Sequence, residues 1–327
     1  MNENKYMRGR LFNRDGDGER EIRELLGVIS AGVSFDKWEP LLPFGVRDVA
    51  AIVGRSVILE LSDIYNLPEG AERDLVLSIE GMPEALAYLR QAVALFTWLK
   101  IIPTLDAQHD ENGRSRRLGE NEKGLTALQE WKDEQNILRL AYEAVDALIE
   151  TMTVNRHTYW LESPKYSVRG SLLLRSKEDF DQYYNIGSHR LFVTLLPMIR
   201  EVQGDSVEPI IGRDRLASLI AGDSMLESLM GETARRAVAL LTMEKAILRL
   251  PVEVIPEGVV QIQVSQPVSS RLRAEKDARM AAAASLSADG ARALDRLASI
   301  VSTLDGKYAT EVRSVGGPIT HSKGITF

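Results

Sequence analysis

Apolar residues recur at helical spacing along most of the chain, and one apolar phrase occurs twice. AVALFT begins at Ala92 and AVALLT begins at Ala237. Both phrases are apolar on most faces, as expected for a helix at the centre of a bundle. Two later stretches carry one stripe each, with steps of three and four residues. The stripes comprise Ile137, Ala141, Val145, Leu148, Ile149 and Met152, and then Ala291, Leu294, Leu297, Ala298, Val301 and Leu304. The pattern predicts a mainly α protein.

Four further landmarks flank the two phrases in the same order. Upstream, FDKWEP is matched by FVTLLP, and the Gly-Arg pair at 54–55 is matched at 212–213. Downstream, LKIIP is matched by ILRLP, and the turn at 112–113 is matched at 257–258. Chance does not readily supply all four in order, so the sequence predicts a tandem duplication. An extra segment near NLPEGAERDLVLSIEGMP makes the first copy the longer one.

Each copy carries a turn signal between its central helix and its last helix. VEVIPEGVVQIQV alternates apolar residues around a Pro-Glu-Gly turn, which indicates a β-hairpin. TLDAQHDENGRSRR contains an Asn-Gly turn with weaker alternation. We therefore expect a tandem duplicated helical bundle in which each copy has a small β-hairpin, more regular in the second copy, plus an extended C-terminal tail.

The expected domain organisation follows from these landmarks. It comprises a flexible N-terminus at 1–18, helical repeat copy 1 at 19–155, a connector at 156–175, helical repeat copy 2 at 176–305 and an extended C-terminal tail at 306–327. The connector mixes aromatic residues with proline and glycine, so we expect it to be packed. Ser176, with Asp179 three residues later, predicts the start of a helix.

Length, composition and charge limit the classes of protein to which this chain can belong. A chain of 327 residues suggests two domains. Its 44% hydrophobic and 27% charged residues are typical of a soluble globular protein. The net charge of −7 argues against a nucleic-acid coat and against an anionic membrane surface. The longest apolar run, 89–102, contains Arg90, Gln91 and Lys100, and we expect it to be too short and too polar to span a membrane. The N-terminal segment does not read as a signal peptide.

Motifs for catalysis or metal binding are not found in the sequence. There is no cysteine, which excludes disulfides and thiol chemistry. His109, His157, His189 and His321 are not spaced as a helical metal site. DGDGER lacks the later ligands of a calcium loop, and the phosphate-loop, dinucleotide and nucleophile-elbow motifs are missing. We expect a protein that is not an enzyme and that has no cofactor.

Two basic clusters and the C-terminal tail are the candidate contact sites. The clusters follow the two turns, in places that the repeat makes equivalent. They are either exposed, solubilising residues or contacts for an acidic partner or DNA. The tail is either a docking segment or a disordered terminus. The candidate residues are Arg114, Arg116 and Arg117, then Arg271, Arg273, Lys276 and Arg279, and, in the tail, Pro318, Ile319, Thr320, Ile325 and Phe327.

Several phrases resemble a known family. FDKWEPLLPFGVRDVAAIVGRSVILEL, LFVTLLPMIREVQGDSVEPIIGRDRLASLI, EDFDQYYNIGSHRLF, AILRLP and the spacing of Trp160, Ser163 and Tyr166 carry the resemblance, over roughly residues 20–305. They resemble a family of uncharacterised proteins from tailed phages and prophages of the Bacteroides group, whose genes commonly lie among capsid and tail genes. That family is similar in layout to phage head–tail connector (adaptor) proteins, which are helical bundles that form twelve-fold rings under the portal.

The resemblance implies a virion structural protein. We expect a neck ring of 12 copies that joins the portal to the tail around the DNA channel. Its partners would be the portal and other neck or tail proteins. DNA would pass without sequence-specific binding, and no membrane would be involved. The ring would assemble in the host bacterial cytoplasm and lie in the virion neck, with the tail of the chain gripping the portal. A tail-terminator or other neck or tail ring protein, and a non-virion helical protein-binding module, are the alternatives.

Overall fold

The chain is mainly helical and divides into two compact units. The computed structural model describes residues 9–27, 32–110, 113–116, 126–250, 252–255, 258–261 and 269–315. The first unit extends to Val168 and includes Ser188–Thr194, and the second comprises Arg169–Gly187 and the chain from Leu195 onward. The sequence-predicted connector at 156–175 is therefore divided between the units.

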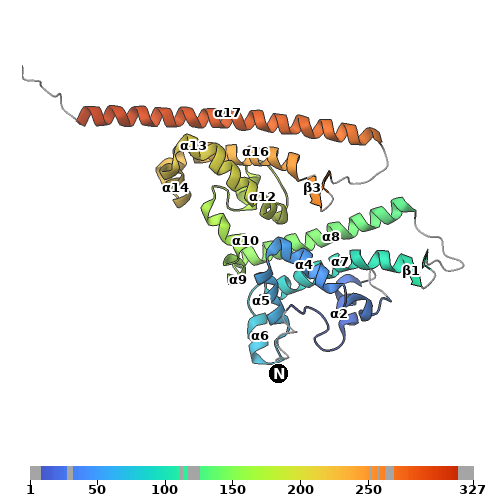
Figure 1. Cartoon of the computed structure of the whole chain (residues 1–327). Coiled ribbons are helices and arrows are strands. Elements are labelled where there is room, and N and C mark those ends of the chain that lie inside the picture. The colour runs from blue at the N-terminus through green and yellow to red at the C-terminus, as the bar shows by residue number, and fades with distance from the viewer. Residues whose placement is uncertain are drawn as a thin grey trace, which may run out of the picture. The chain divides into compact units, whose positions relative to one another are not determined.

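The first unit is built on two long helices joined by a β-ribbon (Figure 1). α7 (Met82–Asp106) packs along α8 (Ala127–Val154). Strands β1 (Ala107–Asp110) and β2 (Gly113–Arg116) lie between them and pair antiparallel, with Ala107 opposite Arg116. The shorter helices are α2 (Gly18–Leu26), α3 (Phe35–Trp38), α4 (Leu42–Val53), α5 (Arg55–Tyr65), α6 (Ala71–Leu77), α9 (Thr158–Leu161) and α10 (Pro164–Ser167).

The second unit also contains a long helix pair joined by a β-ribbon. α16 (Glu232–Arg249) packs along α17 (Ser269–Val315). Between them, β3 (Val252–Ile255) pairs antiparallel with β4 (Gly258–Gln261). The other elements are η2 (Val168–Ser171), α11 (Lys177–Asp181), α12 (His189–Val202), η3 (Gln203–Val207), α13 (Glu208–Ile211), α14 (Arg213–Ala221), α15 (Ser224–Leu226) and η4 (Glu227–Gly231). Val168 of η2 and the residues of α12 up to Thr194 belong to the first unit. η3 and η4 are π-helices, and η2 is a 3-10 helix.

The repeated apolar phrase lies in the core of each unit, as predicted. The residues of Ala92–Leu95 on α7 and of Ala237–Leu240 on α16 are buried. The first predicted stripe is also confirmed, because all six of its residues on α8 are buried: Ile137, Ala141, Val145, Leu148, Ile149 and Met152. These two faces meet where α7 packs against α8, and they supply much of the core of the first unit.

The sequence-based expectation about α7 and membranes needs correction. Among the described helices, Met82–Leu105 is long and apolar enough, by length and composition, to cross a membrane. The run 89–102, which contains Arg90, Gln91 and Lys100, is only part of this longer helix. Over half of the apolar window is buried inside the protein, as in the core helix of a bundle.

The second predicted stripe matches the buried face of α17 at some of its positions and misses it at others. Leu297 and Val301 are buried as predicted, but Ala291 and Ala298 are exposed. The buried face of α17 comprises Ala283, Leu286, Gly290, Ala293, Leu297 and Val301. α17 has alanine at many positions, so apolarity alone leaves the face ambiguous. Gly290 marks the true face, because a Cβ there would lie 2.5 Å from Cδ2 of Leu241 on α16.

Both predicted ends differ from the structure. Residues 9–17 are packed rather than loose, because Leu11 and Phe12 are buried in the first unit. At the other end, α17 continues to Val315, although an extended tail was expected from residue 306. The segment 306–315 carries no apolar stripe in the sequence, so the pattern did not predict that the helix continues. Residues 1–8 and 316–327 lie outside the described residues.

The predicted helix start at Ser176 is confirmed. The Ser176 hydroxyl accepts a hydrogen bond from the Asp179 backbone N–H at 3.0 Å. The Asp179 carboxylate in turn accepts one from the Ser176 N–H at 3.1 Å. This reciprocal pair satisfies two backbone donors that the first turn of α11 leaves free.

Gly45 sets how closely α4 approaches α7, and this gives a test of the packing. A Cβ at Gly45 would lie 2.2 Å from Thr97 Oγ1 and 2.6 Å from the Val93 carbonyl oxygen. Helix propensity alone makes alanine more stable than glycine by about 1 kcal/mol. We expect the opposite sign for Gly45→Ala, a loss of roughly 1–3 kcal/mol, because the carbonyl cannot move away. Urea unfolding followed by tryptophan fluorescence measures it.

Gly204 provides the matched control for this substitution. It lies in η3, and a Cβ there would meet nothing within 4 Å. Gly204 belongs to the second unit, which holds none of the tryptophans, so its unfolding is followed by far-UV circular dichroism. Gly204→Ala should leave stability unchanged or raise it. A stabilising effect of Gly45→Ala would show that α4 and α7 are not in close contact.

Candidate functional site

The structure places the predicted basic clusters on two different kinds of element. Arg114 and Arg116 lie on strand β2, whereas the second cluster lies in the first turns of α17. The expectation that they occupy equivalent places is therefore wrong. In the second cluster, Lys276 is exposed and Arg279 is half-buried. The side chains of Arg114, Arg116, Arg271 and Arg273, together with Arg117 and the tail residues Pro318, Ile319, Thr320, Ile325 and Phe327, lie outside the part of the chain that is described.

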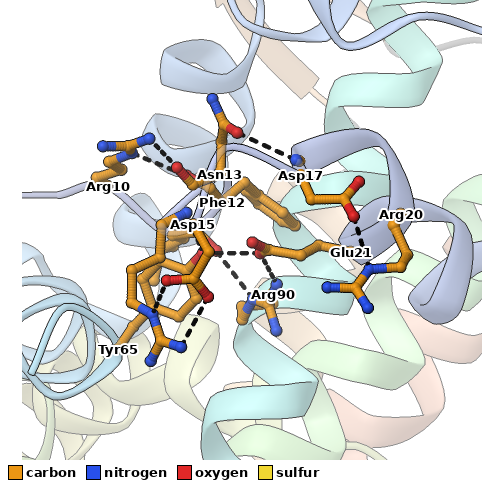
Figure 2. A network of polar contacts seen from close by, with 12 residues as sticks. Arg10, Phe12, Asn13, Asp15, Asp17, Arg20, Glu21, Tyr65 and Arg90 are labelled. Atoms are coloured by element: carbon orange, nitrogen blue, oxygen red, sulfur yellow. Dashed lines mark hydrogen bonds and ion pairs between the residues drawn. The ribbon is translucent and has the colours of Figure 1, made fainter. Parts of the chain in front are cut away.

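A polar network fixes the N-terminal segment to the first unit (Figure 2). Arg90 on α7 donates through Nε to the Leu11 carbonyl at 2.8 Å and pairs with Glu21. Its guanidinium lies 5.1 Å from the ring centre of Phe12 and 4.8 Å from that of Tyr65. Arg90 thus holds the chain around residues 11–12 by a hydrogen bond, an ion pair and two cation–π contacts.

The Tyr65 hydroxyl completes this network. It donates to Glu21 Oε2 at 2.7 Å and accepts from the Arg14 backbone N–H at 2.9 Å. Burial, reinforced by the hydrogen bond to Glu21, raises the pKa of Tyr65. The hydroxyl therefore stays protonated and acts as a donor at neutral pH. These contacts position a chain segment and offer no free base or nucleophile.

The acidic residues of DGDGER form ion pairs, which agrees with the interpretation of this motif as a solvated turn. Asp15 pairs with Arg14 at 2.8 Å, and Asp17 pairs with Arg20 at 2.9 Å (Figure 2). Over the part of the chain that the structure describes, there is no group of three or more His, Cys, Asp or Glu side chains placed to hold a metal ion.

Removing Arg90 is expected to destabilise the first unit. In Arg90→Met the Glu21 carboxylate keeps little exposure to water and loses its cation. We expect a loss of roughly 2–4 kcal/mol, because breaking a largely buried pair leaves an uncompensated charge. Chemical unfolding followed by tryptophan fluorescence measures this loss. The control is Arg23→Met, whose ion pair with Glu19 is exposed and should contribute less than about 1 kcal/mol. Equal effects of the two substitutions would contradict the role of Arg90.

An apolar groove of about 580 Å³ lies in the first unit. It is formed by the segment at 9–13 and by α4 and α5, with Leu42, Val46 and Ile58 among its lining residues. Arg47 also lines the groove, pairs with Asp48 at 3.3 Å and lies 5.5 Å from the ring centre of the exposed Phe44. The lining offers apolar contact and a few charges, and no acid–base pair.

A three-residue ion-pair group in the second unit links α12 to α16. The Glu201 carboxylate accepts from Lys245 at 2.5 Å and from Arg249 at 2.6 and 2.9 Å. These hydrogen bonds, that of Arg249 foremost, lower the pKa of Glu201 to about 2. The group is a structural clamp between two helices.

This lowered pKa predicts a pH dependence of stability. A carboxyl whose folded pKa lies below its ordinary 4.5 contributes stability above pH 4.5. That contribution is lost as the pH falls from 4.5 towards about 2. We expect Glu201→Gln to lower the melting temperature of the second unit at neutral pH, and the difference from the native protein to shrink on acidification. Far-UV circular dichroism melts at several pH values test this, and a difference that does not depend on pH would contradict it.

Two exposed apolar pairs were missed by sequence reasoning. Leu75 and Ile79, at the end of α6, are 70% and 49% exposed. Met225 and Leu229, on α15 and η4, are 61% and 40% exposed. Each pair immediately precedes the central helix of its unit. The spacing of four residues was visible in the sequence, but periodicity does not show whether an apolar face is buried.

The C-terminal helix is much longer than the helix it packs on. α17 has 47 residues and α16 has 18, or about 70 Å and about 27 Å at 1.5 Å per residue. Among the residues of α17 whose side chains the structure describes, 276–306, the buried ones fall between Ala283 and Val301. The remainder of α17 therefore extends beyond α16, as Figure 1 shows.

The comparisons with known proteins concern mainly the first unit. A family of unknown function (DUF6712) matches residues 62–170. The match covers α6 to α10 and thus the whole helix–ribbon–helix arrangement of α7 and α8. No curated protein and no solved structure matches the chain. The chain is thus a mainly helical, two-unit protein that resembles this family over one unit.

Proposed function

We propose that this protein is a phage virion structural protein, a head–tail connector (adaptor) ring of the neck that joins the portal to the tail around the DNA channel. The observation that carries the proposal is the element order of the two units. Each consists of short helices, a buried central helix, a β-ribbon and a long closing helix. In the second unit the closing helix extends beyond its partner. The sequence resemblance to phage proteins supplies the biological setting.

The backbone at two glycines supports the proposed duplication. Gly54 ends α4 and begins α5 with φ 96° and ψ 147°. Gly212 ends α13 and begins α14 with φ 82° and ψ 152°. This conformation is essentially confined to glycine. The two units thus use the same glycine-dependent corner, followed in both cases by arginine.

The spacing of later elements supports the duplication as well. Three features of the first unit recur 145 residues later in the second unit. They are the central phrase (92 and 237), the start of the first strand (107 and 252) and the start of the second strand (113 and 258). An unbroken register from central helix to ribbon favours descent of both units from one helix–ribbon–helix module.

A duplicated helical chain is suited to a ring. Subunits of a cyclic ring contact each other through two different surfaces, one on each side. Two similar but non-identical units offer such surfaces on one chain. In the proposed ring, which by resemblance has 12 copies, the extended α17 and the residues after it would contact the portal. DNA would pass through the ring without sequence-specific contacts.

The proposal is tested on virions and on purified proteins. Mass spectrometry of purified virions should detect the chain at a fixed ratio to the portal. A portal pull-down should retain the full-length chain and lose a variant that ends at residue 306. Recovery on tails that lack the portal would favour a tail-terminator role, and absence from virions together with failure to bind the portal would overturn the virion assignment.

A further inference from the structure

The first unit has an acidic surface around its exposed apolar pair. We define the α6 patch as Leu75, Ile79, Glu72 and Asp74. Glu72 and Leu75 are three residues apart on α6, which places them on one face of the helix, and Ile79 follows two residues after the helix ends. Both carboxylates are exposed, and neither forms an ion pair with another described residue. α6 has no buried residue, so this helix contributes surface rather than core.

The second unit has a basic surface beside its exposed apolar pair. We define the η4 patch as Met225, Leu229, Arg236, Arg292 and Arg296. Leu229 and Arg236 are seven residues apart, on nearby turns of the continuous η4–α16 segment. The three arginines line a hollow of about 270 Å³ between α16 and α17, together with Thr233, Ala293, Glu232 and Asp289.

The cations of the η4 patch exceed the local anions. Asp289 pairs with Arg292. Arg236 and Arg296 are exposed, and within the described part of the chain no carboxylate pairs with them. With three arginines and the two carboxylates Glu232 and Asp289 in its lining, the hollow carries an excess of positive charge.

The two patches complement each other in composition. Each has two large apolar side chains at a spacing of four residues, and the charges beside them are opposite. Surface apolar pairs flanked by charge are typical of protein contacts in which burial gives affinity and charge gives specificity. The apolar pair of each patch lies in the segment that precedes the central helix of its unit.

We propose that copies of this chain associate head to tail, with the α6 patch of one copy docked on the η4 patch of the next. The occupant of each patch is thus a second copy of the chain. This inference rests on the proposed ring and identifies its subunit contact. Because the two surfaces differ, the contact is heterologous and propagates until the ring closes.

The test uses two full-length variants that each lose one patch. Leu75→Glu with Ile79→Glu removes the α6 patch, and Met225→Glu with Leu229→Glu removes the η4 patch. All four positions are exposed, so both variants should fold, which circular dichroism checks. In analytical ultracentrifugation the native chain should form oligomers, and each variant alone should be monomeric. An equimolar mixture should form 1:1 heterodimers, because each variant retains the patch that the other lacks.

A charge exchange tests the complementarity. Arg236→Glu with Arg296→Glu should weaken association by roughly tenfold or more, which corresponds to about 1.4 kcal/mol or more. Adding Glu72→Arg and Asp74→Arg to the same chain should restore it. The controls are Val154→Glu and Leu248→Glu, which alter exposed apolar residues outside both patches and should leave assembly unchanged.

Three results would overturn the inference: a monomeric native chain at its highest soluble concentration, a patch variant that assembles like the native chain, or a mixture that gives no heterodimer. The result is independent of the virion test. Head-to-tail assembly without virion localisation would reject only the neck assignment, and virion localisation without the heterodimer would reject only this contact.

Discussion

Replacing Trp38 with alanine is expected to lower the free energy of unfolding of the first unit by roughly 3–5 kcal/mol. The indole is completely buried and stacks on Trp98, with ring centres 5.3 Å apart and planes 17° apart. Trp38 is the one buried residue of α3 and packs this four-residue helix on the core. Its removal leaves a cavity that a helix held by the surrounding core cannot collapse to fill.

Tryptophan fluorescence can measure the unfolding of the first unit separately. All four, Trp38, Trp98, Trp131 and Trp160, belong to the first unit. Intrinsic fluorescence therefore reports that unit alone, and the three remaining residues still report it in Trp38→Ala. Phe44→Ala is the control, because the ring of Phe44 is 44% exposed. A loss for Trp38→Ala no larger than that of the control would show that the stacked pair does not anchor α3.

The sequence predicted the parts of the fold in which apolar and polar residues contrast sharply. On α8, charged residues separate Ile137 from Val145 and Met152, so just one face can be buried. On α17, alanine occupies neighbouring faces, and the pattern indicated Ala298 where the structure buries Ala293. The small volume of Gly290, which admits Leu241, decided the face. Close approach of two helices is a tertiary property that one helix's pattern does not contain.

The N-terminal segment shows a second limit of prediction from the sequence pattern. Residues 9–17 contain two apolar residues among polar ones, which is typical of a mobile terminus. Arg90, far along the chain, supplies the partner that orders them by binding Leu11 and stacking on Phe12. Contacts over such separations are set by the fold, and the sequence offered no signal for this one.

The candidate interaction surfaces could be predicted least. The basic hollow of the η4 patch combines Arg236 from α16 with Arg292 and Arg296 from α17. These residues become neighbours because α16 and α17, which the β3–β4 ribbon connects, pack antiparallel. The basic clusters predicted from the sequence consist of residues that are close together in the chain, because the sequence directly shows only such neighbours. A surface made by two helices needs their packing to be known.

Buried and exposed residues of the two units carry different information. The repeated phrase preserves packing, so Ala92 and Ala237 are equally buried. The segments before the central helices differ, with acidic α6 in one unit and η4 beside a basic hollow in the other. Under the proposed duplication, divergence of the surfaces on a shared core would give the two different contact faces that the proposed head-to-tail association requires.

Replacing Leu297 with aspartate is expected to destabilise the second unit by more than about 4 kcal/mol. Leu297 is completely buried in the face that α17 packs on α16, so a carboxylate there would lose its contact with water. Release of α17 would remove a large share of the helical circular dichroism signal at a lower temperature. Tryptophan fluorescence should keep its midpoint, because the tryptophans belong to the first unit.

Ala298→Asp separates this packing from the sequence-predicted stripe. The two positions are adjacent, and Ala298 is exposed, so the same charge there should change stability by no more than about 0.5 kcal/mol. If Ala298→Asp were the more damaging of the two, the stripe predicted from the sequence would be the true packing face. If the fluorescence midpoint fell together with the circular dichroism midpoint in Leu297→Asp, the two units would unfold as one, and their separate cores would not be independent sources of stability.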